Sequence, residues 1–201
     1  LLGLAVDWVA ASVSMNLLLD EVKEATGRIS TLVSAVKSYS QMDRASLQPC
    51  DLVEGLDSTL VMLGHKLRSG VRIERRYASD LPPVEARAGE LNQVWTNLVD
   101  NAVDAMDGHG TLTVSAGPDP GSAGWVLVEI ADTGSGMSPD VVSHAFEPFF
   151  TTKEVGKGTG LGLDISRRIV VERHSGDIDI ESGAGGTLVR VRLPQRHRGT
   201  T

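Results

Sequence analysis

The chain has 201 residues, of which 41% are hydrophobic and 22% charged, so it can bury a core and is not an intrinsically disordered segment. With 26 acidic and 19 basic residues it carries a net charge of −7, which argues against non-specific nucleic-acid binding because phosphate contacts need clustered lysines and arginines. The single cysteine, Cys50, excludes an internal disulfide and suits a reducing compartment.

The first 45 residues form the first predicted region, which is helical. The apolar run 1–15 contains Asp7 and is too short to span a bilayer, so we expect no membrane segment and a cytoplasmic protein. The absence of a starting methionine indicates a fragment. An a/d heptad seam follows, with apolar residues at alternating spacings of four and three: Leu18, Val22, Ala25, Ile29, Leu32, Val36 and Tyr39. Such a helix must pack against another, either within one bundle or, as we favour, at a dimer interface.

The second predicted region, residues 46–201, alternates between helical and strand patterns. A linker covers 41–49, and Asp51 with Glu54 predicts a capping box at the start of a helix. Two further helices are expected at 90–106 and 161–174. Strands are expected at 71–77, 111–116, 125–131, 177–181 and 187–193. Short connections favour mostly antiparallel pairing, so we predict an α+β fold, a two-layer α/β sandwich with its helices on one face of the sheet.

Asn97 and Asn101 lie four residues apart inside the predicted helix 90–106, so their amides share one face. Asparagine is a poor residue for a helix interior, and two on one stripe require a reason. A neutral oxygen donor beside phosphates suits Mg²⁺, which uses few protein ligands. The alternative is a pair of ordinary surface amides.

Asp132 ends a predicted strand and is followed by Gly134 and Gly136. A carboxylate in this place can accept a hydrogen bond from the exocyclic amine of adenine, whereas guanine presents an acceptor oxygen there. The glycines allow the backbone to approach a base closely. The alternative is a simple Asp-Gly turn.

All three phenylalanines of the chain, Phe146, Phe149 and Phe150, fall within five residues of a stretch without periodicity. We interpret them as part of a mobile lid that docks on the body when nucleotide binds, with Lys153 able to meet a phosphate. A small satellite core under a long loop is the alternative interpretation.

The glycine-rich stretch 156–163 leads directly into the third predicted helix. Its exposed backbone N–H groups and the helix N-terminus favour phosphate. No strand ends immediately before it and no Gly-Lys-Ser/Thr closes it, so neither a Rossmann fingerprint nor a P-loop fits.

In their order, these four segments resemble the N, G1, F and G2 boxes of sensor histidine kinases, within the GHKL group of ATPases. Gly185, Gly186 and Thr187 resemble the final glycine motif of that family. The resemblance covers residues 51–194 and implies a Bergerat-type ATP-binding fold. The helix with the heptad seam, through residues 38–44, resembles the second helix of the dimerisation and phosphoacceptor domain, so residues 1–45 would be a part of that domain.

The resemblance implies ATP and Mg²⁺ as cofactors, with Asn101 as metal ligand and Asn97 and Lys153 as catalytic residues near the phosphates. Asp132 would bind adenine with support from Thr187, while Gly134 and Gly136 would line the base pocket. The remaining residues expected around the phosphates are Gly158, Gly160, Leu161 and Gly162, and the lid is expected to run from about Met137 to Gly158. An amide at position 97 cannot act as a general base, so ATP hydrolysis should be slow and phosphotransfer favoured.

The acceptor histidine of the family, normally followed by an acid, has no counterpart here. The five histidines are followed by Lys, Gly, Ala, Ser and Arg: His65, His109, His144, His174 and His197. We therefore expect the acceptor helix upstream of Leu1 and no autophosphorylation by this fragment. The expected partners are a second copy of the chain and a response regulator. A serine-kinase (anti-sigma type) relative and a non-catalytic nucleotide sensor are the competing hypotheses.

Overall fold

A computed structural model describes residues 46–67, 70–154 and 158–196. Before residue 46 it describes only Trp8, Ser14, Met15, Leu18, Leu19, Val22 and Thr26. The chain divides into two units. The body comprises Arg44–Phe150 and Gly160–Thr201, and the second unit comprises Leu1–Asp43 and Thr151–Thr159. Of the predicted seam, Leu18 and Val22 are helical and exposed. The other seam positions lie outside the described residues.

The body is built from helices and strands that alternate along the chain. Its helical elements are α2 (Leu52–Met62), α3 (Gly64–Leu67), α4 (Ala88–Ala105), α5 (Pro139–His144), α6 (Gly162–Arg167) and the π-helical segment η1 (Arg168–Arg173). Its strands are β1 (Gln48–Cys50), β2 (Val71–Tyr77), β3 (Val84–Ala86), β4 (Gly110–Pro118), β5 (Trp125–Asp132), β6 (Asp177–Gly183) and β7 (Gly186–Pro194).

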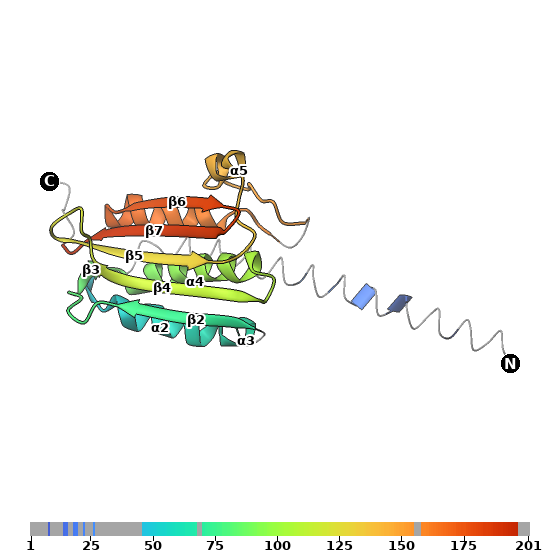
Figure 1. The fold of residues 1–201 in the computed structure, drawn as a ribbon, viewed down its shortest axis with the longest axis horizontal. Helices are drawn as coiled ribbons and strands as arrows, with labels where there is room; N and C mark the ends of the chain where they lie inside the picture. Colours follow the sequence, from blue (N-terminus) through green and yellow to red (C-terminus); the bar gives the residue numbers. More distant parts are fainter. Residues whose placement is uncertain are drawn as a thin grey trace. The chain divides into compact units, whose positions relative to one another are not determined.

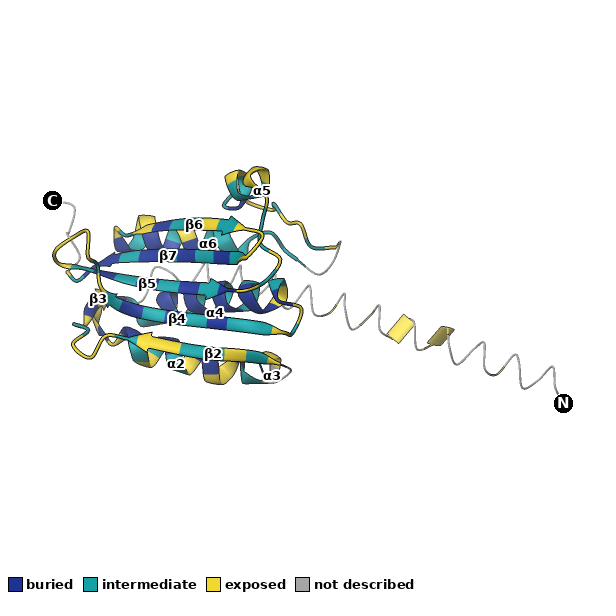
Figure 2. Cartoon of the chain, in the orientation of Figure 1, coloured by how far each residue is buried: buried dark blue, intermediate teal, exposed yellow. Residues whose placement is uncertain are grey.

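Five strands form one mixed sheet in the order β2-β4-β5-β7-β6. Three neighbouring pairs are antiparallel, whereas β2 pairs with β4 in parallel because α4 crosses between them. Helices α2, α4 and α6 cover one face of this sheet (Figures 1 and 2). The predicted α+β class with helices on one face of the sheet is therefore confirmed, and the parallel edge strand is an addition to it.

The core lies between that sheet face and the helices. Along β5 every second residue is buried, and Figure 2 shows the same alternation on its neighbours. Helix α4 supplies the apolar stripe that faces the sheet, including Trp95, which is fully buried. The largest fully buried side chains are Trp95, Leu56, Leu91, Leu98, Leu112, Ile169 and Leu193.

The Asp51 half of the predicted capping box is present at the start of α2. Oδ1 of Asp51 accepts hydrogen bonds from the backbone N–H groups of Val53 (2.8 Å) and Glu54 (3.3 Å). Two predictions need correction. The end of the expected linker 41–49 forms β1, which pairs antiparallel with β3. The single helix expected at 161–174 begins at Gly162 and changes to π-helical geometry at Arg168.

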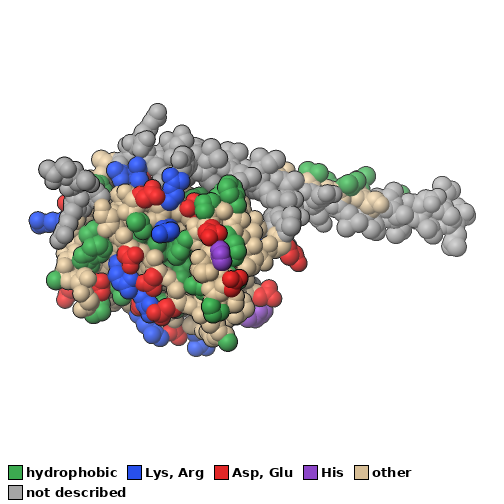
Figure 3. Space-filling model, turned by 90° about the horizontal axis from the view of Figure 1, so that it is seen from above, with side chains coloured by type: hydrophobic (Ala, Val, Ile, Leu, Met, Phe, Trp, Pro, Cys, Tyr) green, Lys and Arg blue, Asp and Glu red, His purple; other side chains and the backbone are tan. Residues whose placement is uncertain are grey.

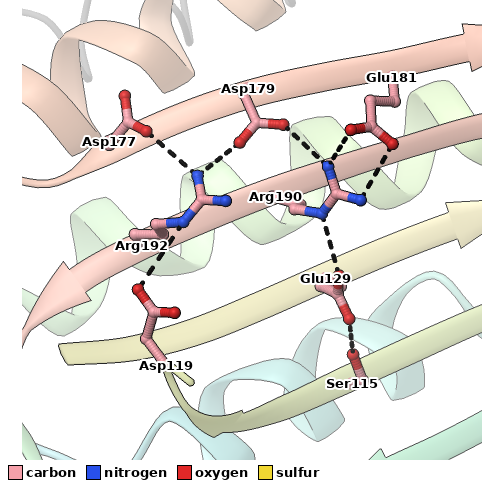
Figure 4. A network of polar contacts seen from close by, with 8 residues as sticks. All are labelled: Ser115, Asp119, Glu129, Asp177, Asp179, Glu181, Arg190 and Arg192. Carbon is pink, nitrogen blue, oxygen red and sulfur yellow. Dashed lines mark hydrogen bonds and ion pairs between the residues drawn. The ribbon is translucent and has the colours of Figure 1, made fainter. Parts of the chain in front are cut away.

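The other face of the sheet is polar and carries a network of ion pairs (Figure 4). Arg190 on β7 contacts Glu129, Asp179 and Glu181, and Arg192 contacts Asp177 and Asp179. In the view of Figure 3, acidic and basic side chains lie next to each other rather than in separate fields. Among the described residues, no helix has the length and apolar character needed to cross a membrane.

Candidate functional site

Asp132, the last residue of β5, is the first side chain of the site. It is 9% exposed, and its Oδ1 accepts the backbone N–H groups of Gly134 (2.8 Å) and Thr187 (3.3 Å). Burial raises the pKa of Asp132, while these two hydrogen bonds act in the opposite direction. Within the described part of the chain both hydrogen bonds go to Oδ1, so Oδ2 remains able to accept from an external donor. A buried carboxylate with one such oxygen suits recognition of an amine.

The glycines after Asp132 are required for close backbone packing. Gly136 has φ +67°, and a Cβ there would overlap the carbonyl oxygen of Gly183 in the β6–β7 turn. A Cβ on Gly134 would lie 2.6 Å from the carbonyl oxygen of Ala105 at the end of α4. These glycines thus allow the loop after β5 to pack against both the end of α4 and the end of β6. Their predicted place in the lining of a base pocket stays a prediction.

Asn97 connects α4 to the beginning of α6. Its Nδ2 donates to the carbonyl oxygen of Gly162 (3.0 Å) and to Oγ of Ser166 (3.3 Å). Because a carbonyl oxygen can only accept, the amide nitrogen must face Gly162, and this fixes the direction of Oδ1. Asn101, one turn further along α4, is half-buried. The structure therefore brings Asn97 together with the start of α6, and its predicted place near the phosphates stays a prediction.

The predicted phosphate segment approaches the phenylalanine stretch through Gly160. Gly160 has φ +65°, its carbonyl oxygen accepts the N–H of Phe149 (2.9 Å), and a Cβ there would lie 2.6 Å from the Phe149 carbonyl oxygen. Leu161 caps α6 without a side-chain hydrogen bond, and Gly162 is the first helical residue. Phe149 is 73% exposed, so its ring is available to dock elsewhere.

Lys153 and Gly158 belong to the segment Thr151–Thr159, which is part of the second unit. Within this segment the N–H of Lys153 donates to Oγ1 of Thr151 (3.2 Å), and a Cβ on Gly158 would lie 2.6 Å from the same oxygen. Lys153 and Gly158 therefore both lie close to Thr151. The predicted contact of these two residues with phosphates stays a prediction.

The sequence alone did not identify two residues that form hydrogen bonds between distant segments, Ser182 and His174. Ser182 bonds to both Thr187 and Met137. His174 is 2% exposed, and its Nε2 accepts the N–H of Arg87 (3.0 Å) while Nδ1 donates to the carbonyl oxygen of Ile169 (2.8 Å). His174 thereby ties η1 to the start of α4. No sequence signal distinguishes either from an ordinary turn serine or surface histidine.

The donor set fits a nucleotide-bound metal better than a metal held by protein alone. The described residues contain no group of three or more His, Cys, Asp or Glu side chains that could hold an ion. Mg²⁺ commonly takes one or two protein oxygens and completes its shell with phosphate oxygens and water. A single amide oxygen, such as that of Asn101, fits this coordination of Mg²⁺.

Comparison with known proteins agrees with this geometry. Residues 86–197, more than half of the chain, match the family described as "Histidine kinase-, DNA gyrase B-, and HSP90-like ATPase". Sensor kinase CckA of Brucella abortus is 34% identical over 187 residues, which are 87% of this chain and 20% of CckA. The chain therefore spans about a fifth of the length of that relative.

Solved structures place the fold in the same group. The catalytic domain of the histidine kinase ThkA has a TM-score of 0.67 at 29% identity, covering 75% of this chain and 99% of that domain. Full-length ShkA, solved in complex with AMPPNP, has a TM-score of 0.70 at 28% identity, covering 82% of this chain and 35% of ShkA. The chain belongs to the histidine kinase-, DNA gyrase B- and HSP90-like ATPases, as the catalytic ATPase domain of a sensor histidine kinase.

Proposed function

We propose that this chain binds ATP together with Mg²⁺ and transfers the γ-phosphoryl group to a histidine outside the chain. The observation that carries the proposal is the hydrogen bonding of the Asp132 carboxylate. Its Oδ1 is used by two backbone N–H groups, and Oδ2 is left for the exocyclic amine of adenine. A guanine would place an acceptor oxygen opposite this carboxylate, so the site selects adenine.

The division of roles follows the arrangement on α4 and α6. Asn101 would hold Mg²⁺, which neutralises charge on the phosphates when it is bound. Asn97, fixed by Gly162 and Ser166, is an amide and cannot take a proton from water at neutral pH. Slow ATP hydrolysis and transfer to a delivered acceptor are therefore expected. Lys153, Gly158, Gly160 and Leu161 complete the proposed phosphate surroundings.

The partners in the proposal are a second copy of the chain, bound through residues 1–45, and a response regulator. Residues 1–45 would supply part of a dimerisation and phosphoacceptor region, and residues 46–201 the ATP-binding domain. ThkA has also been solved in complex with the response regulator protein TrrA. We extend that class of partner to this chain on the basis of family membership.

Calorimetric titration with a non-hydrolysable ATP analogue, with and without Mg²⁺, tests the binding half of the proposal. We expect one-to-one binding that Mg²⁺ strengthens and that the matching GTP analogue does not show. Asn101→Ala should remove only the gain due to the metal. Equal weakening with and without Mg²⁺ would contradict its role as a ligand.

The transfer half needs the full-length protein. Incubation with Mg·ATP should give acid-labile phosphohistidine, whereas acid-stable phosphoserine on a partner would point to a serine kinase. Binding without any transfer in the full-length protein would indicate a nucleotide sensor.

A further inference from the structure

Ser182, Thr187 and Asp132 lie in one row across three neighbouring strands. Thr187 on β7 is the register partner of Asp132 on β5 and of Ser182 on β6. The backbone N–H of Thr187 donates to Asp132, and its side-chain Oγ1 lies 2.8 Å from Oγ of Ser182. Ser182 is therefore one hydrogen bond away from a residue that contacts the adenine-binding carboxylate.

Ser182 also holds the first residue of the predicted lid. Its Oγ accepts the backbone N–H of Met137 at 2.8 Å, although the two residues are 45 positions apart. Its third neighbour is the carbonyl oxygen of Gly186 at 3.2 Å. One hydroxyl thus contacts the lid, the β6–β7 turn and Thr187.

The proton count of this cluster leaves two arrangements. A serine hydroxyl has one proton, and the Met137 N–H already occupies one of its lone pairs. If that proton goes to the Gly186 carbonyl, the Thr187 hydroxyl must donate to Ser182 and can only accept from a ligand. If it goes to Thr187, the Thr187 hydroxyl keeps its own proton for a ligand. The contact between Ser182 and Thr187 is a hydrogen bond in both arrangements, whereas the 3.2 Å contact with the Gly186 carbonyl is one only if Ser182 donates to it, so the geometry favours the first arrangement.

Resting on the proposed function, we propose that Ser182 is a positioning residue of the nucleotide site. It donates to the Gly186 carbonyl and accepts from Thr187, so that the Thr187 hydroxyl presents a lone pair to a water that donates to N1 of adenine, and it anchors the lid by accepting the N–H of Met137. Ring nitrogen N1 is an acceptor beside the exocyclic amine. When Asp132 accepts from the amine, N1 therefore needs a donor, and a water bound to the Thr187 lone pair supplies one.

Two variants and one modified nucleotide test the base-directed part. Calorimetry compares ADP with 1-deaza-ADP, in which N1 is replaced by C–H, on the wild-type chain, Ser182→Ala and Ser182→Thr. We expect Ser182→Ala to weaken ADP binding about tenfold and 1-deaza-ADP binding less than about twofold. Ser182→Thr, which keeps the hydroxyl, should bind ADP nearly as the wild type does. Ser115→Ala, which removes a strand hydroxyl from the opposite face of the sheet, is the matched control and should change neither affinity.

The outcomes separate this inference from the proposed function. Equal weakening of both nucleotides by Ser182→Ala would show a general structural effect and overturn the role through Thr187. Absence of ADP binding by the wild-type chain would instead overturn the proposed function. Hydrogen exchange of the Met137 amide without nucleotide tests the anchor by itself. Faster exchange in Ser182→Ala is expected, and unchanged exchange would refute the anchor.

Discussion

Replacing Asp132 by asparagine should change ligand affinity and stability in opposite directions. The amide oxygen can still accept the N–H groups of Gly134 and Thr187 that now bond to Oδ1. The amide nitrogen then takes the place of Oδ2 and presents a donor to the donor amine of adenine. Loss of a hydrogen bond to a charged group corresponds to roughly 1.5–3 kcal/mol, so ATP affinity should fall about ten- to a hundredfold.

The nucleotide-free protein should become more stable at neutral pH. Burial raises the pKa of Asp132 in the folded state, so ionising this carboxyl disfavours folding. The resulting loss of stability is complete once the pH exceeds the pKa of Asp132 in the folded state. It disappears below the pKa of the unfolded state, where the carboxyl is protonated in both states. The neutral asparagine avoids the loss at every pH. The stability difference between variant and wild type should therefore grow as the pH rises from about 3 to 7.

Two measurements on the same preparations check this reasoning. Calorimetry with a non-hydrolysable ATP analogue gives the affinity, and urea unfolding of the nucleotide-free protein across pH gives the stability. Unchanged affinity would remove Asp132 from the base site. A variant less stable than the wild type at pH 7 would show that the carboxylate stabilises the empty site, contrary to the cause given for its raised pKa.

Three further substitutions test contacts within the body. Gly136→Ala should strongly destabilise the body because its Cβ would overlap a backbone oxygen, whereas Gly185→Ala, with no atom within 4 Å, should melt within a few degrees of the wild type. His174→Phe removes one buried and one part-buried hydrogen bond to the backbone and should cost roughly 2–4 kcal/mol in urea unfolding. The exposed control His109→Phe should cost little, and equal losses would refute the role of His174. Arg190→Met removes ion pairs at the surface, so the variant should be slightly less stable than the wild type. This difference should shrink in 1 M salt because salt screens surface charges, and a difference that does not depend on salt would indicate a packing role instead.

The sequence by itself determined the longer elements and the identity of the family. Helix α4 and the pairs β4–β5 and β6–β7 have strong local periodicity, and their two hairpin connections are short, so each was predictable without tertiary contacts. Asn97, Asp132 and the glycines were identified because their residue types are unusual for the elements that carry them. The fold class followed from the order of these elements.

Tertiary structure alone decided the short strands and the couplings between distant residues. Strands β1 and β3 have three residues each and exist because they pair with one another, which no local pattern reveals. The bond from Arg87 to His174 joins residues 87 positions apart, and that from Met137 to Ser182 joins residues 45 apart. A side chain whose role is to accept one distant backbone N–H carries no periodic or compositional signal. Its function becomes visible only when the sheet and the helices have brought the two segments together.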